Sequence, residues 1–109
     1  MTFRLYLLQR LTAALMAPLI VGHLAVILYA GIDGLTASEI LGRTRGSPGW
    51  AAFYGIFVLA VSIHGAIGVR AILAEWTPLR SRGALDALMW GFGLVLAALG
   101  LRAVTAVVL

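Results

Sequence analysis

The sequence predicts an all-α membrane protein with three transmembrane helices. Of its 109 residues, 62% are hydrophobic and 11% are charged, whereas an ordinary globular chain is about 45–50% apolar and about 25% charged. Three apolar segments each exceed the roughly 20 residues that a helix needs to cross the hydrocarbon core of a bilayer. A soluble domain of this size could not bury so much apolar surface, so the lipid bilayer is the expected environment of most side chains.

The chain is expected to form a single transmembrane domain, residues 1–109, with spans over about 5–30, 50–76 and 84–109. Turn-forming residues separate the spans, namely Gly31 to Gly34, Gly46 to Gly49, and Thr77-Pro78 with Gly83. Residues 36–42 in the first loop are expected to form a short surface helix. Thr36 is its expected N-cap, and Glu39 occupies the capping-box position.

The arginines predict the orientation of the spans. All eight basic residues are Arg, and they lie scattered at the ends of segments. This pattern argues against a nucleic-acid partner, which would need a clustered basic face. Most of them flank the start of the first span or the loop between the second and third spans: Arg4, Arg10, Arg70, Arg80 and Arg82. The positive-inside rule therefore places the N-terminus inside and the C-terminus outside.

His23 and His64 are the only histidines, and each lies in the middle of a different apolar segment. An ionisable residue inside the membrane marks a functional site by default. The rise per residue places His23 roughly 10 Å and His64 roughly 20 Å from the outer ends of their helices. The two are therefore not expected to ligate the same iron, and each would need a second ligand from another polypeptide. On the residues alone, a hydrogen bond to a neighbouring helix explains each histidine equally well.

The surroundings of His64 suit a flat macrocycle. Phe53, Phe57, Ala60, His64 and Gly68 form one stripe at helical spacing. Glycine at position 68 allows close approach by a porphyrin or by another helix. The chain contains no cysteine, which excludes thiolate haem ligation, thiolate zinc sites and iron–sulfur clusters held by this chain.

The segment from His64 to Arg70, with Gly68 and Val69 between them, resembles the haem motif of cytochrome b anchor subunits of succinate dehydrogenase and fumarate reductase. Ala71 and Glu75 replace the later residues of that motif. Near the N-terminus, Arg10 and Thr12 match a second motif of these anchors, in which Tyr6 and Gln9 replace the usual Ser and His. Such anchors are chains of this size with three membrane helices, so the resemblance covers the whole length.

The resemblance implies a role for each matching residue. His64 would be an axial ligand of haem b, with Gly68 beside it, and Arg70 would neutralise a haem propionate. Arg10 would serve a propionate or the quinone head group, Thr12 would hydrogen-bond a quinone carbonyl, and Trp76 would lie near the quinone. His23 would ligate a second haem iron, so the number of haems, one or two per anchor assembly, stays open.

The resemblance also implies partners. A second anchor chain, identical or homologous, would complete a larger helical bundle in a bacterial-type inner membrane. A flavoprotein subunit and an iron–sulfur subunit would dock on the inner face. Electrons would pass between iron–sulfur clusters, quinone and haem, so this chain would be a non-catalytic redox subunit of a succinate:quinone oxidoreductase. The direction of the reaction and the type of quinone stay open.

Three alternative functions remain. The first is an anchor that binds quinone and the catalytic subunits without haem. The second is a small transporter or proton pathway, which would usually carry an acidic residue deep in a span, whereas Glu75 and Asp86 lie at span ends. The third is a cytochrome b subunit of another membrane dehydrogenase, which would commonly have more helices.

Overall fold

The computed structural model describes residues 2–109, which form four helices and no strand. These are α1 (Phe3–Asp33), α2 (Ala37–Thr44), α3 (Pro48–Trp76) and α4 (Arg82–Val108). The helices α1, α3 and α4 are each long and apolar enough to cross a membrane, which confirms the predicted fold class. Each long helix begins two residues before the predicted span. Hydroxyl side chains cap these starts and continue the helix past the apolar run: Thr2, Ser47 and Ser81.

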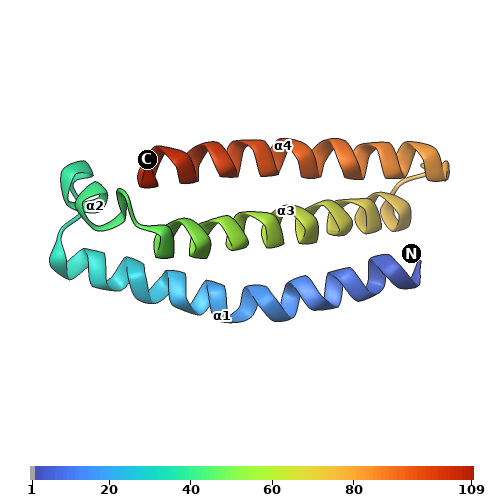
Figure 1. The fold of residues 1–109 in the computed structure, drawn as a ribbon. Coiled ribbons are helices and arrows are strands. Elements are labelled where there is room, and N and C mark those ends of the chain that lie inside the picture. The colour runs from blue at the N-terminus through green and yellow to red at the C-terminus, as the bar shows by residue number, and fades with distance from the viewer. Residues whose placement is uncertain (1) are drawn as a thin grey trace.

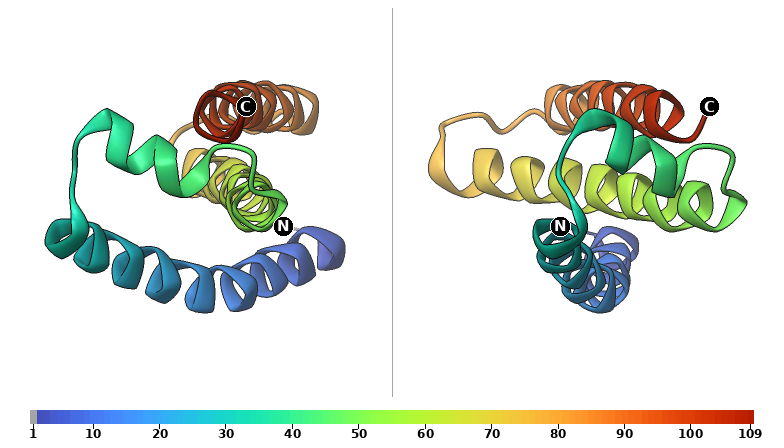
Figure 2. Two further views of the ribbon diagram at one scale, coloured as in Figure 1. Left: turned by 60° about the vertical axis from the view of Figure 1, so that its left-hand side comes forward. Right: turned by 90° about the vertical axis from the view of Figure 1, so that its left-hand side faces the viewer.

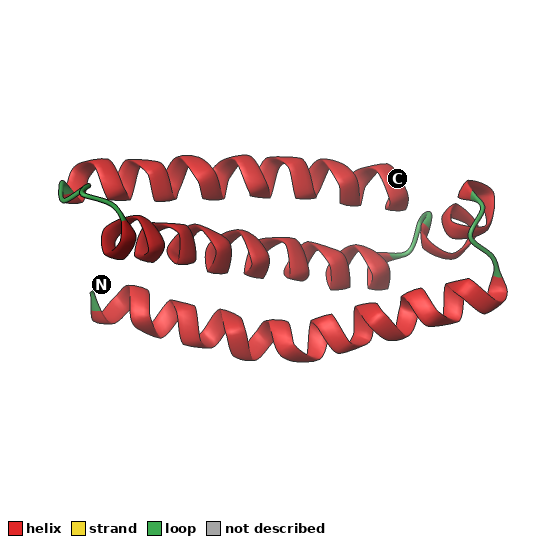
Figure 3. Ribbon diagram, turned by 180° about the vertical axis from the view of Figure 1, so that it is seen from behind, coloured by secondary structure: helices red, strands yellow, loops and turns green. Residues whose placement is uncertain are grey.

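The central helix is α3, which runs antiparallel to α1 and α4 and contacts both (Figure 1). The helices α1 and α4 lie on opposite sides of α3 and barely touch each other, as both views in Figure 2 show. The loops are confined to the two ends of the molecule (Figure 3). The chain is 50 Å long, which exceeds the roughly 30 Å thickness of a hydrocarbon core.

Small residues bring α3 and α4 together. A Cβ atom placed on Gly93 would lie 3.1 Å from the Ala66 Cβ, and one placed on Gly100 would collide with the side chain of Val58. Backbones that approach this closely gain van der Waals contact without needing large side chains between them. The buried core is correspondingly small, and most large apolar side chains face outward, where lipid or another chain can cover them.

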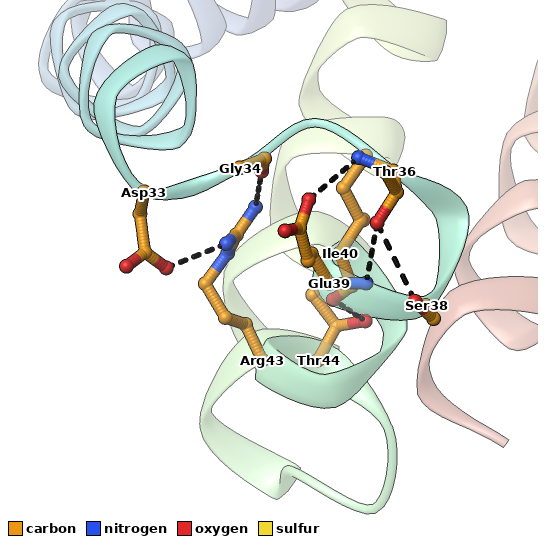
Figure 4. A network of polar contacts seen from close by, with 8 residues as sticks. All are labelled: Asp33, Gly34, Thr36, Ser38, Glu39, Ile40, Arg43 and Thr44. Atoms are coloured by element: carbon orange, nitrogen blue, oxygen red, sulfur yellow. Dashed lines mark hydrogen bonds and ion pairs between the residues drawn. The ribbon is translucent and has the colours of Figure 1, made fainter.

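The short helix α2 begins with the predicted capping box. The Glu39 amide donates to the Thr36 hydroxyl at 3.3 Å, and the Thr36 amide donates to the Glu39 carboxylate at 2.9 Å (Figure 4). The hydrogen bond from the Thr36 amide lowers the pKa of Glu39 below its ordinary 4.5, and the Thr36 hydroxyl and the charge of Arg43 act in the same direction. Gly34 precedes the box with φ +144°, and the Glu39 carboxylate occupies the place that a side chain at Gly34 would need.

The segment between α1 and α3, which includes α2, is bonded to the ends of α1 and α4. Arg43 forms an ion pair with Asp33, the last residue of α1, with 2.7 Å between Nη1 and Oδ2 (Figure 4). The Thr44 hydroxyl donates at 2.6 Å to the carbonyl of Val107 near the end of α4. The second bond satisfies a carbonyl that has no partner within its own helix. The loop therefore holds the ends of α1 and α4 in place beside the start of α3.

Candidate functional site

His64 is half-buried on α3 and contacts α1. Its Nδ1 atom lies 3.2 Å from the Oγ1 atom of Thr12, one helix away. The Thr12 hydroxyl also lies 2.7 Å from the carbonyl of Leu8 and 3.1 Å from that of Gln9, both in the preceding turn of its own helix. Thr12 itself is buried. His64 is therefore held at the α1–α3 interface through one ring nitrogen, and its Nε2 atom has no hydrogen-bond partner among residues 2–109.

His23 lies on α1 and, like His64, faces the α1–α3 interface, where it contacts α3. Its Nδ1 atom lies 3.4 Å from the hydroxyl of Tyr54, and its ring meets those of Tyr54 and Phe57 edge to face, with centroids 5.7 Å and 5.6 Å apart. His23 also lines a hollow of about 310 Å³ between α1, α3 and α4. Ser62 and Gly100 contribute to its wall. One edge of the imidazole is thus held by an aromatic hydroxyl, and the residue borders open space.

The two histidines lie at different depths. His23 is level with Tyr54 on α3, and Tyr54 precedes His64 by ten residues. At the rise of an α-helix this places the two imidazoles about 15 Å apart along the helix axis. The separation is larger than the sequence estimate because α1 extends past the level at which α3 begins. Axial ligands of one iron must face each other across it, so these two imidazoles are not placed to ligate the same iron.

Arg70 forms an ion pair that was not predicted from the sequence. Its Nε atom lies 2.8 Å from Oδ1 of Asp86 on α4, and its side chain is 9% exposed while that of Asp86 is 50% exposed. The pair spans the α3–α4 interface, whereas His64 contacts α1. The sequence does carry a signal for this pair: Asp86 lies at the start of the third span, and Arg70 lies at the same membrane level near the end of the second.

The remaining predicted site residues lie toward the end of the molecule where α1 begins. The guanidinium carbon of Arg10 lies 6.0 Å from the ring centre of Tyr6, and Arg10 is exposed. Trp76 is also exposed, at the last position of α3. The Oε1 atom of Gln9 is buried and has no hydrogen-bond partner within residues 2–109, and its Nε2 atom would lie 3.5 Å from a Cβ atom on Gly68. A Cβ atom at that distance would be in ordinary van der Waals contact, so α3 packs against α1 at Gly68 without requiring a glycine there.

Among residues 2–109, His64 and His23 are the side chains that could hold the iron of a haem, a cofactor that brings its own equatorial ligands. Residues 2–109 contain no group of three or more His, Cys, Asp or Glu side chains placed to hold a metal ion. Each histidine instead turns Nδ1 toward a hydroxyl of the neighbouring helix. Where Nδ1 carries the proton, Nε2 is the nitrogen that can meet an iron, and a hydrogen bond donated by Nδ1 is the usual support of a metal-ligating imidazole.

The fold and the site define a multi-pass α-helical membrane protein with two intramembrane histidines at separate depths. The chain belongs to the succinate dehydrogenase/fumarate reductase transmembrane subunit family, whose family model matches residues 1–101. It is 36% identical over 84 residues to the succinate dehydrogenase hydrophobic membrane anchor subunit of Archaeoglobus fulgidus, a match that covers 76% of this chain and 71% of the relative. No solved structure matches the chain. The chain is thus a membrane anchor of the succinate dehydrogenase/fumarate reductase type, as its sequence motifs predicted.

Proposed function

We propose that this anchor binds haem b and connects the iron–sulfur clusters of a succinate:quinone oxidoreductase with quinone and haem. The observation that carries the proposal is the position of His64: it lies deep in a span, and its Nδ1 atom is held by Thr12. An imidazole at that depth is costly unless it has partners, and one hydroxyl satisfies only one of its two nitrogens. A haem iron would satisfy the other.

In this proposal each histidine serves one haem. His64 would hold the iron of a haem toward the inner side, and His23 would hold that of a haem toward the outer side. Because the two imidazoles lie about 15 Å apart along the helix axis, each iron takes its second ligand from a second anchor chain, identical or homologous. When bound, haem supplies one-electron redox chemistry. The chain's own part is to hold the imidazoles, exclude water and balance charge.

The inner end of the anchor is proposed to bind quinone and the soluble subunits. Arg10 and Trp76 are exposed at the end where α1 begins and α3 ends, so both are proposed contacts of a quinone head group. Arg70 is proposed to meet a haem propionate through its Nη atoms, since its Nε atom is bonded to Asp86. The flavoprotein and iron–sulfur subunits would dock at this same end, on the inner face of a bacterial-type cytoplasmic membrane.

The test is to purify the tagged anchor from membranes that also express its flavoprotein and iron–sulfur partners. The proposal predicts that both partners co-purify and that the reduced-minus-oxidised spectrum shows a b-type haem. His64→Ala should remove a b-type signal, whereas the matched control Ile63→Ala, an exposed neighbour on the same helix, should keep it. A spectrum without Soret absorption, together with intact co-purification, would identify a haem-free anchor and contradict the proposal.

A further inference from the structure

We propose that Thr12 is the positioning residue of His64, a role that rests on the proposed haem ligation. Its hydroxyl fixes the imidazole with the proton on Nδ1 and leaves the lone pair of Nε2 for the iron. This differs from the role that the sequence motif implies for Thr12, a hydrogen bond to a quinone carbonyl. Thr12 is 7% exposed, and its hydroxyl already has three polar neighbours.

The direction of the hydrogen bond follows from the surroundings of the Thr12 hydroxyl. A hydroxyl has one hydrogen to donate and two lone pairs that accept. The Leu8 carbonyl at 2.7 Å and the Gln9 carbonyl at 3.1 Å can only accept, and a helical threonine commonly donates to the preceding turn in this way. The hydrogen is therefore directed to a carbonyl, and a lone pair faces His64 Nδ1 at 3.2 Å. An acceptor at that distance requires that Nδ1 carry the proton.

The tautomer that results is the one that binds a metal. A neutral imidazole protonated on Nδ1 has its lone pair on Nε2. The bond to Thr12 also limits rotation of the ring and raises the basicity of Nε2, as second-sphere acceptors do for metal-bound histidines. A more basic axial ligand favours ferric over ferrous iron. Thr12 on α1 thus sets both the orientation and the electron donation of a ligand on α3.

His23 offers an internal comparison. Its Nδ1 atom also faces a hydroxyl, that of Tyr54, but the distance is 3.4 Å and no carbonyl among residues 2–109 takes the hydroxyl hydrogen of Tyr54. That hydroxyl can therefore donate to His23 as readily as it can accept, and it does not fix the tautomer. Tyr54→Phe removes the hydroxyl beside His23 and leaves the Thr12 hydroxyl beside His64 in place. This variant is therefore the matched control.

The experiment measures the haem midpoint potentials of the purified whole complex by optical redox titration, together with its haem content. Thr12→Val keeps the shape of the side chain and removes the hydroxyl. In Thr12→Val we expect the affinity of the His64 site for ferric haem to fall about tenfold more than its affinity for ferrous haem. For a one-electron couple this raises the midpoint potential by about 59 mV. Thr12→Ser restores the hydroxyl and should restore the potential, and Tyr54→Phe should leave the potential of the same haem unchanged.

The outcomes separate this inference from the proposed function. If His64→Ala removes haem while Thr12→Val leaves the potential of the remaining complex unchanged, the positioning role is overturned and the haem-binding function stands. If His64→Ala keeps all haem, the proposed function itself fails. A shift in Thr12→Ser as large as that in Thr12→Val would also overturn the role, because it would show that packing alone sets the potential. If Thr12→Val does not assemble, Thr12→Ala gives the same readout with a smaller side chain.

Discussion

The ion pair between Arg70 and Asp86 should stabilise the packing of α3 against α4, and its two partners should contribute unequally. Two unit charges about 4 Å apart attract each other by about 4 kcal/mol at an effective dielectric constant of about 20. The exposure of Asp86, 50%, reduces the net contribution to about 1–2 kcal/mol because water screens that carboxylate. Asp86→Asn leaves a buried guanidinium without its counter-charge, so it should destabilise the anchor by about 2 kcal/mol. Arg70→Gln leaves only a half-exposed carboxylate and should destabilise it by about 1 kcal/mol.

The assay is unfolding of the full chain in mixed micelles with increasing dodecyl sulfate, followed by circular dichroism. The double variant completes a thermodynamic cycle, whose coupling energy should be about 1 kcal/mol. Arg82→Gln, an exposed arginine at the start of α4, is the control for loss of one positive charge and should change the unfolding free energy little. Strictly additive effects of the two single variants would refute the pair as a stabilising contact. So would a larger loss for Arg70→Gln than for Asp86→Asn.

Two further predictions concern packing and pH. Gly100→Ala should destabilise the anchor by about 1–3 kcal/mol in the same micelle assay, because the new Cβ collides with Val58. The control Gly91→Ala should not destabilise it, because a Cβ at Gly91 meets open space. Equal losses of stability in the two variants would contradict the close approach of α3 and α4. The pKa of Glu39 is lowered in the folded chain by the bond from the Thr36 amide, so its contribution to α2 is present above the unfolded value of 4.5 and is lost as the pH falls through the lower folded value. The protection factors of the α2 amides, which compare measured exchange with the intrinsic rate at each pH, should therefore fall at acidic pH in the wild type, and Glu39→Gln should remove most of that pH dependence.

The sequence predicted those features that depend on neighbouring residues in the chain. The three spans follow from the lengths of apolar runs, and α2 follows from the capping pair Thr36 and Glu39, because helix length and capping are local properties. The depth difference between His23 and His64 was also accessible, since it needs only the rise per residue. Its size was underestimated because the levels of the helix ends are set by how the helices pack.

The sequence did not predict contacts that depend on the register between helices. The bond between Thr12 and His64 and the pair between Arg70 and Asp86 each join residues on different helices. Their geometry depends on how far one antiparallel helix is shifted and rotated against the next, which no single helix specifies. The resemblance of the motif around Thr12 implied a quinone contact. The packing of α1 against α3, which the motif does not specify, places the Thr12 hydroxyl against the imidazole of His64.

The most direct test of the account is a pyridine haemochrome determination of haem per complex for the wild type, His64→Ala and His23→Ala. Because His23 and His64 lie at separate depths and each would hold one haem, we expect two haems per wild-type anchor assembly. If the assembly pairs this chain with a homologous second chain, each single variant should lose one haem and leave the spectrum of the other unchanged. If the assembly pairs two identical chains, each variant removes both ligands of one haem, and again one haem should remain. A count of one, with His23→Ala spectrally silent, would contradict the two-level account and restrict the haem site to His64.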